Sequence, residues 1–248
     1  MAGGAGADII DIQMGCPAKE VTGALSGSAL MRDLDEAERL IAATVAATKR
    51  PVTLKMRLGW DERSKNAPDL AVRAERAGVQ AITVHGRTRC QFYAGTADWR
   101  AVAEVKSATR LPVIVNGDIV DLETSRYALE QSGADAVMLG RGVYGRPWLA
   151  SLLDGALSRG VSVSEPDLAT RTLIALEHFH DSLRFYGDAH VVTIFRKHLV
   201  WYIERAPQPH TALARRDTKA RLCRLTSPRE IEQALIALWS DEPLSLAA

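Results

Sequence analysis

The residue whose type and setting most suggest chemistry is Cys16, which follows the apolar run 9–14 and directly precedes Pro17. A thiol just past the end of a strand lies where barrel and doubly wound enzymes place their reactive groups. Such a thiol could act as a nucleophile or as a proton donor. The alternative is a small thiol packed in the core.

A second pair of candidates, Lys55 and Arg57, lies in the run 52–58, where apolar residues occupy every other position. In a strand this alternation predicts that both cations face away from the apolar side. A cation on a buried strand is costly unless it is paired. Two interpretations are therefore open: an internal salt bridge, or an anionic or electron-rich ligand at a barrel mouth.

Further polar residues follow later apolar runs. His85 and Arg87 close one of them, and the turns 116–118 (Asn-Gly-Asp) and 140–142 (Gly-Arg-Gly) follow the last two. In TIM barrels the loops after the last two strands often form a phosphate site from backbone N–H groups. Ordinary turn chemistry is the alternative for both turns.

These residues need a frame of strands and helices to bring them together. We expect strands at 9–14, 52–58, 81–85, 113–116 and 136–139, and helices at 37–48, 69–77, 99–107 and 122–132. Asp35 and Asp121 are the expected N-caps, with Gly78 and Gly133 as C-caps.

Alternation of strands and helices predicts a parallel sheet with right-handed crossovers. With polar residues at the carboxyl end of each strand, the predicted fold is an α/β TIM (β/α)8-type barrel. Only about five βα units are recognised, so the barrel over residues 1–150 is expected to be incomplete.

After residue 150 the pattern changes to helices alone. Residues 151–165 are the expected linker, and an all-α domain is expected over 166–248, with helices at 173–185, 191–204, 209–224 and 228–239. His178 and His180 lie two residues apart on one helix and point apart, so a metal site there is discounted.

The helical part is rich in cations. Between residues 196 and 229 there are nine lysines and arginines but only two acidic residues. This excess indicates binding to a phosphate backbone, although a solvated basic face would show the same composition. The basic residues are Arg196, Lys197, Arg205, Arg215, Arg216, Lys219, Arg221, Arg224 and Arg229.

Composition limits the remaining possibilities. The 248 residues carry a net charge of +1, so the overall field selects no partner, and any nucleic-acid surface must be local. Three widely spaced cysteines do not make a disulfide framework, and the expected location is the reducing cytoplasm. Neither a signal peptide nor a run of roughly 20 apolar residues is recognised, which predicts a soluble protein away from membranes.

Several segments, taken in order, resemble the tRNA-dihydrouridine synthase family, and its bacterial B-type branch most closely. They are 11–19 (DIQMGCPAK), 27–31 (GSALM), 54–60 (LKMRLGW), 83–89 (TVHGRTR), 97–99 (ADW), 115–119 (VNGDI), 138–142 (MLGRG) and 196–198 (RKH). A series of motifs in one order over nearly the whole chain is far more specific than a lone glycine motif.

The resemblance implies an FMN-dependent TIM barrel followed by a helical tRNA-binding domain, acting as a monomer without a metal ion. Such enzymes reduce the C5–C6 bond of particular uridines in tRNA, with NADPH reducing the flavin. Carried over by resemblance, Cys16 is the acid that protonates uracil C5. The cofactor residues would be Lys55, His85, Asn116, Gly117, Asp118, Gly140 and Arg141, and the RNA contacts would be Gln13, Arg87, Arg196, Lys197 and His198.

Two features depart from the family pattern. The family has three strands before the Gly-Cys-Pro strand, with an Ala-Pro-Met-type turn and a Gln that also hold FMN, and these are not recognised here. The expectation is therefore a truncated chain that folds poorly and binds FMN weakly or not at all. In addition, Gln13 stands where the family usually has Asn, so the amide reaches one methylene further.

Two other functions remain open from the sequence. One is a catalytically inactive RNA-binding remnant that keeps the basic helical domain without a complete flavin site. The other is an FMN barrel acting on a small molecule, which the basic helical part and the Cys16 loop disfavour. Retention of flavin and salt-sensitive binding of tRNA would separate the three.

Overall fold

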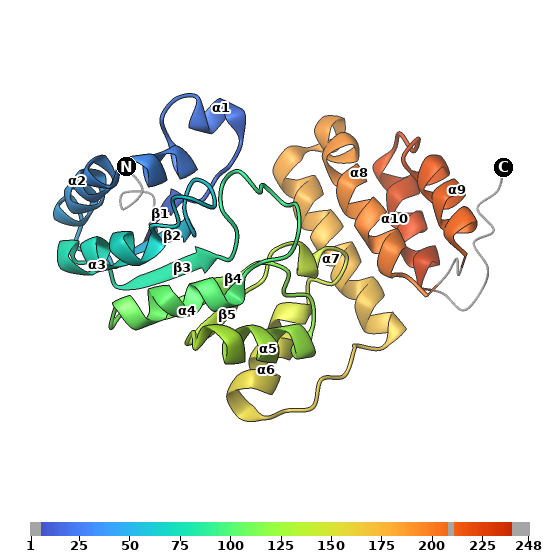
Figure 1. Ribbon diagram of the computed structural model, residues 1–248. Helices are drawn as coiled ribbons and strands as arrows, with labels where there is room; N and C mark the ends of the chain where they lie inside the picture. Colours follow the sequence, from blue (N-terminus) through green and yellow to red (C-terminus); the bar gives the residue numbers. More distant parts are fainter. Residues whose placement is uncertain (1–5, 208–210, 240–248) are drawn as a thin grey trace. The chain divides into compact units, whose positions relative to one another are not determined.

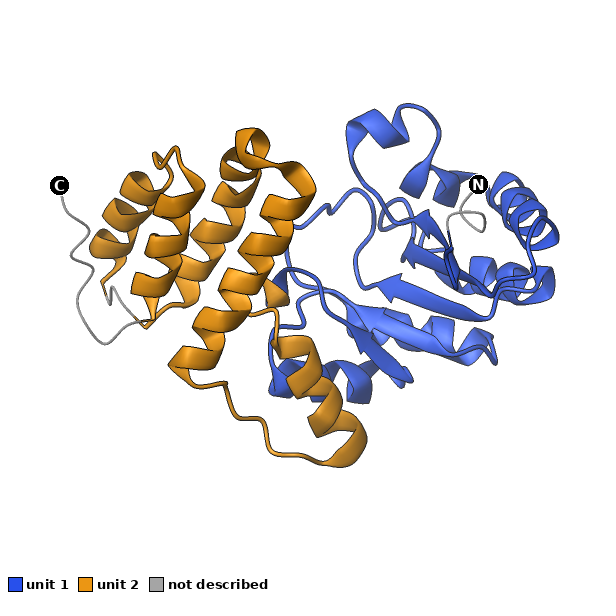
Figure 2. Ribbon diagram, turned by 180° about the vertical axis from the view of Figure 1, so that it is seen from behind, with its two compact units in different colours: residues 1–142 blue, residues 143–248 orange. Residues whose placement is uncertain are grey.

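The computed structural model describes residues 6–207 and 211–239. The chain forms two compact units, Met1–Gly142 and Val143–Ala248 (Figure 2). Unit 1 contains the sheet, and unit 2 is helical in its described residues.

In its described residues, unit 1 has five parallel strands that lie in the order of the chain (Figure 1). A doubly wound sheet reverses its strand order at a switch point, whereas a barrel wall keeps sequence order. Five strands are fewer than the eight of a closed barrel, so unit 1 is a partial α/β barrel, as predicted. The strands are β1 (Ile10–Met14), β2 (Val52–Arg57), β3 (Ala81–His85), β4 (Val113–Asn116) and β5 (Ala136–Met138).

Helices connect the strands and cover one face of the sheet (Figure 1). That face is apolar: Leu54, Met56, Ile82 and Val115 are fully buried in the core of unit 1. The connections are α1 (Lys19–Thr22), η2 (Gly27–Arg32), α2 (Leu34–Ala46), α3 (Ala67–Ala77), α4 (Trp99–Ala108) and α5 (Leu122–Ser132), and the short η3 (Arg141–Val143) follows β5.

The register of the strands sets which side chains share the opposite face. Paired positions on neighbouring parallel strands point to the same side of the sheet. One row runs Gln13, Lys55, Thr83, Ile114 and Ala136, and the next, nearer the carboxyl ends, runs Arg57, His85, Asn116 and Met138. The alternation predicted for Lys55 and Arg57 is therefore confirmed.

Most helix ends in unit 1 follow the expected capping chemistry. Asp121 forms a capping box with Thr124, and Gly78 and Gly133 end their helices in the left-handed conformation. The expected cap Asp35 is wrong, because α2 begins earlier: Asp33 is extended, and its carboxylate accepts a hydrogen bond from the N–H of Glu36 at 3.0 Å.

Unit 2 begins earlier than the sequence suggested. Helix α6 (Leu149–Arg159) covers much of the expected linker 151–165, and the segment without regular structure is 160–167. The expected strand-free pattern holds for the described residues after Met138. The remaining helices are α7 (Leu168–Tyr186), α8 (Asp188–Arg205), α9 (Ala212–Leu222) and α10 (Pro228–Leu238).

The expected helices at 173–185, 191–204 and 228–239 are confirmed with small changes at their ends. The helix expected at 209–224 starts only at Ala212, and its expected first residues, 209 and 210, lie outside the described part of the chain. Phe179, Phe195, Leu199 and Leu235 are buried together in the core of unit 2. Within the described residues, no helix is both long and apolar enough to cross a membrane.

The corrected cap of α2 is testable. Asp33→Ala should lower the free energy of unfolding of unit 1 by about 1 kcal/mol, because it leaves an N–H at the helix start without its acceptor. Asp35→Ala, which loses only an exposed ion pair with Arg73, should cost about 0.5 kcal/mol or less. Urea denaturation followed by circular dichroism measures both, and equal losses would refute the assignment.

Candidate active site

The carboxyl edge of the sheet brings three of the predicted residues together. Lys55 donates a hydrogen bond from Nζ to Oδ1 of Asn116 at 3.3 Å. The amide nitrogen of Asn116 in turn donates to the carbonyl of Met138 at 2.8 Å. His85 pairs in register with Asn116 on the neighbouring strand. The three side chains therefore share one face of the sheet and hold each other in defined orientations.

Burial and crowding of cations control ionisation at this edge. Desolvation, with the nearby charge of Arg57, lowers the pKa of Lys55, and Asp11 offsets part of this effect. Desolvation and the charges of Arg57, Lys55 and Arg87 lower the pKa of His85 to about 3. His85 is therefore a neutral imidazole at pH 7 and can serve as a neutral hydrogen-bonding group.

Arg57 follows neither of the two interpretations that the sequence left open. It is 1% exposed, and no carboxylate among the described residues lies within ion-pair distance of it. Instead it donates to the carbonyl oxygens of Gly15, Thr88 and Phe92, at 2.9, 2.8 and 2.9 Å. Arg57 therefore ties the turn that carries Cys16 to the loop after β3.

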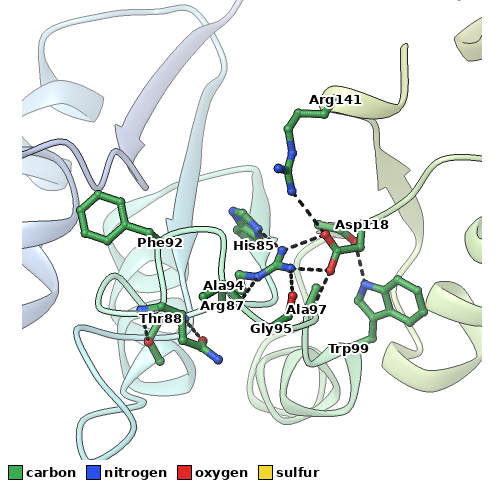
Figure 3. Close-up of polar contacts among 12 residues, drawn as sticks. His85, Arg87, Thr88, Phe92, Ala94, Gly95, Ala97, Trp99, Asp118 and Arg141 are labelled. Carbon is green, nitrogen blue, oxygen red and sulfur yellow. Dashed lines mark hydrogen bonds and ion pairs between the residues drawn. The ribbon is translucent and has the colours of Figure 1, made fainter. Parts of the chain in front are cut away.

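An ion pair between the buried Arg87 and the half-buried Asp118 joins the loop after β3 to the loop after β4 (Figure 3). Both guanidinium Nη atoms of Arg87 donate to the carboxylate of Asp118, at 2.9 and 2.6 Å. The remaining donors of Arg87 reach the carbonyls of Ala94 and Gly95, and the N–H of Ala97 donates to Asp118 at 2.7 Å. The pair thus fixes the β3–α4 connection against the turn after β4.

The surroundings of Asp118 keep it ionised. Burial alone would raise the pKa of Asp118, but the hydrogen bonds from Arg87 and Ala97 and the charges of Arg87 and Arg141 outweigh burial and lower it. Arg87 itself is 2% exposed. Its donors bind groups inside unit 1, so Arg87 has a structural role here, and its expected contact with RNA stays a prediction.

The turn 116–118 needs its glycine. Gly117 has φ +113°, and a Cβ there would lie 2.8 Å from Ala97 Cβ and from His85 Cδ2. Its carbonyl accepts a hydrogen bond from the indole of Trp99 at 2.9 Å. The next residue, Asp118, also has a left-handed φ of 55°, which the Arg87 pair holds in place.

The second predicted turn is more open. No atom lies within 4 Å of a Cβ placed on Gly140. Arg141 is 57% exposed, and its guanidinium lies 3.6 Å from Asp118. An anion can therefore reach the backbone of Gly140 and the guanidinium of Arg141, whereas Arg57 and Arg87 are buried.

Tyr93 is a candidate that the sequence analysis missed. It is 55% exposed, and its ring lies 4.9 Å from the guanidinium of Arg141, 5.7 Å from that of Arg57 and 6.5 Å from the imidazole of His85. An aromatic residue in the loop between a barrel strand and its helix was the available signal.

In unit 2 the predicted RNA contacts differ in character. Lys197 is exposed, and Arg196 is half-buried. Desolvation, with the charges of His178 and Lys197, lowers the pKa of His198 to about 4, so the imidazole is neutral at pH 7. His198 packs edge-on against His178 and Trp201. Any contact of His198 with RNA would therefore be uncharged.

Part of the basic excess in unit 2 is structural. Arg215 donates to the carbonyls of Ile203, Glu204 and Ala206, and Lys219 pairs with Glu204. These two cations join α8 to α9 and are not available to a partner in the way the sequence count assumed.

His178 and His180 also have partners within unit 2. Nδ1 of His178 lies 3.0 Å from the hydroxyl of Tyr202, and Nε2 of His180 lies 3.0 Å from Glu232. The described residues contain no group of three His, Cys, Asp or Glu side chains suited to a metal ion.

Comparison with known proteins gives a consistent result. A family model described as dihydrouridine synthase (Dus) matches residues 1–234. A probable tRNA-dihydrouridine synthase of Rickettsia conorii is 52% identical over 204 residues, which cover 82% of this chain and 62% of the relative. The corresponding protein of Rhizobium leguminosarum bv. phaseoli is 53% identical, covering 93% of this chain and 69% of the relative.

A further relative carries a more specific name. The tRNA-dihydrouridine synthase B of Xanthomonas campestris pv. campestris is 46% identical over 82% of this chain and 61% of its own length. The chain therefore spans about 62% of the length of relatives such as the Rickettsia protein. Among solved structures, mandelate oxidase matches with a TM-score of 0.34 and 18% identity, over 82% of this chain and 66% of that chain.

The Arg87–Asp118 pair gives a testable prediction. Asp118→Asn keeps the shape of the side chain but leaves the buried Arg87 without a counter-charge, which should cost about 3–5 kcal/mol of unfolding free energy. Asp98→Asn is the matched control. Asn caps α4 as well as Asp does, so this substitution should change the free energy of unfolding by only ~0.3 kcal/mol. Equal losses in urea denaturation would contradict the role of the pair.

Proposed function

The chain belongs to the dihydrouridine synthase family, and on that premise we propose that it reduces the C5–C6 double bond of uridines in tRNA with a bound flavin mononucleotide. The observation that carries the proposal is the convergence of Lys55, His85 and the turns 116–118 and 140–141 at the edge of the sheet that also bears the Cys16 turn. This is where barrel enzymes bind substrate and cofactor.

The residues present fit a phosphorylated, electron-rich cofactor. Lys55 has three donors, and Asn116 accepts one of them. The open backbone at Gly140 and the exposed guanidinium of Arg141 suit a phosphate group. We propose that Lys55 and His85 contact the flavin ring, while residues 116–118, Gly140 and Arg141 hold the ribityl phosphate.

The chemistry divides between the cofactor and the chain. Bound FMN would supply the hydride that is added to uracil C6. We propose that Cys16 holds a proton on Sγ and gives it to C5, so that one hydride and one proton saturate the double bond. Cys16 is partly exposed, so solvent can return the proton to the thiolate that remains.

The ionisation of the site suits this division. Because His85 is neutral at pH 7, it adds no positive charge beside the two cations Lys55 and Arg57. Lys55, whose pKa is lowered, is then the cation that contacts the electron-rich flavin ring. A pyridine nucleotide, NADPH in the family pattern, is the proposed source of reducing equivalents.

Unit 2 is proposed to bind the tRNA. Arg215 and Lys219 are engaged within the unit. The exposed cations that remain for RNA include Lys197, Arg216, Arg221 and Arg224. A uracil in folded RNA must leave its stack before a flavin can lie against it. Phosphate contacts made by unit 2 would supply binding energy for that step and would weaken steeply with salt.

The experiment that tests the proposal measures dihydrouridine in tRNA by mass spectrometry after incubation with the chain, FMN and NADPH. Cys16→Ala should lower the rate by about 100-fold or more, the usual contribution of a positioned acid. Cys90→Ala, at an exposed thiol in the same unit, is the matched control and should keep the wild-type rate. Dihydrouridine formation that is unaffected by Cys16→Ala, or absent in the wild type, would overturn the proposal.

A further inference from the structure

Side chains hold the polar backbone groups on both sides of the Cys16 residue. The N–H of Gly15 donates to Oε1 of Gln13 at 2.8 Å. The carbonyl of Gly15 accepts from Nε of Arg57 at 2.9 Å. The carbonyl of Cys16 accepts from both Oγ and N of Ser28, at 2.7 and 3.1 Å. Both peptide groups next to the thiol-bearing carbon are therefore fixed.

The three side chains that hold these groups come from three different elements. Gln13 lies in β1, Arg57 ends β2, and Ser28 lies in η2. Arg57 and Ser28 are fully buried, so water does not compete for their hydrogen bonds. We call Gln13, Ser28 and Arg57 the Cys16 brace.

The backbone at Gly27 passes close to Cys16. Gly27 has φ +59°, and a Cβ there would lie 2.9 Å from the carbonyl oxygen of Cys16 and 3.2 Å from its Cβ. Only a glycine therefore lets η2 approach closely enough for Ser28 to reach the Cys16 carbonyl. The motif 27–31 acquires a physical role through this contact.

Arg57 extends the brace to the other side of the site. Its Nη1 donates to the carbonyls of Thr88 and Phe92, which precede Tyr93 in the loop after β3. Phe92 has a left-handed φ of 51°, an unfavourable conformation for a bulky residue that needs such support. One guanidinium thus sets the spacing between the Cys16 turn and the loop after β3.

Gly15 and Pro17 are buried and Cys16 is half-buried, so the backbone groups of this turn need partners inside the protein, and the partners that they find fix the position of the thiol. A proton donor must be held near the reacting atom, and a misplacement of about 1 Å can cost about 100-fold in rate. We infer that Gln13, Ser28 and Arg57 are positioning residues that hold Cys16 in place to protonate its substrate. This inference rests on the proposed function, in which Cys16 is the acid.

The inference also changes the expected role of Gln13. The carboxamide oxygen is engaged by the Gly15 N–H, so the side chain supports the turn whether or not its nitrogen meets the base. A glutamate at this position would keep the acceptor, whereas a methionine of similar length would lose it. Comparing the two substitutions separates the effect of the hydrogen bond that supports the turn from the effect of the size of the side chain.

The test measures alkylation of Cys16 by iodoacetamide in the folded 248-residue chain, relative to Cys90 in the same molecules, by peptide mass spectrometry. Releasing one hydrogen bond of about 1 kcal/mol should expose the half-buried thiol and raise this ratio about fivefold in Gln13→Met and in Ser28→Ala. Gln13→Glu should stay within about twofold of the wild type. Gln80→Met, at an exposed glutamine elsewhere in unit 1, is the control and should leave the ratio unchanged.

Activity supplies the second readout. In the dihydrouridine assay Gln13→Met and Ser28→Ala should lower kcat with KM for tRNA unchanged, and Gln13→Glu should restore kcat. The inference is overturned if Gln13→Met gives the same alkylation ratio as Gln80→Met, or if Gln13→Glu behaves like Gln13→Met. Failure of the proposed function is a distinct result: the alkylation differences persist while Cys16→Ala leaves dihydrouridine formation unchanged.

Discussion

The site depends on the ion pair between the buried Arg87 and the half-buried Asp118. The pair spans two loops that come from different strands and uses two donors of the guanidinium, while two more reach the carbonyls of Ala94 and Gly95. It also keeps Asp118 in a left-handed conformation directly after Asn116 and Gly117. A buried pair of this kind adds little stability over apolar packing, but loss of one partner is costly. Its contribution here is geometry, because the edge that carries His85 and Asn116 is defined by it.

A second constraint comes from Arg57, which also binds the loop after β3. Arg57 pairs in register with His85, and Arg87 follows His85 by two residues. Both arginines are buried, so neither is available to a ligand. Both bind backbone carbonyls of the loop that contains Tyr93. The cations that remain for a ligand are therefore Lys55 and Arg141, and the buried arginines act by placing the groups around them.

Strand positions and strand facing were predictable, because alternation such as that around Lys55 depends only on local geometry. The order of motifs also predicted the family. The pairing of Arg87 with Asp118 was not predictable, because it joins residues in different loops through a contact that no local pattern encodes. For the same reason the sequence does not distinguish Arg215 and Lys219, which have partners on α8, from exposed cations. Asp33 and Asp35 are equally good caps by type, and only the actual start of α2 separates them.

The central claim is that the carboxyl edge of this sheet binds FMN through Lys55 and the turn at Gly140. Absorbance titration of the purified chain with FMN tests it most directly, because flavin bands shift when the ring leaves water. The account predicts a shift of the flavin bands for the wild type. It predicts the same shift for the control Thr53→Val, which changes a side chain on the same face of the sheet but below the edge. In Lys55→Met the affinity for FMN should fall about tenfold, because about one charge-assisted hydrogen bond is lost. No shift in the wild type, or equal affinities for FMN in the wild type and Lys55→Met, would contradict it.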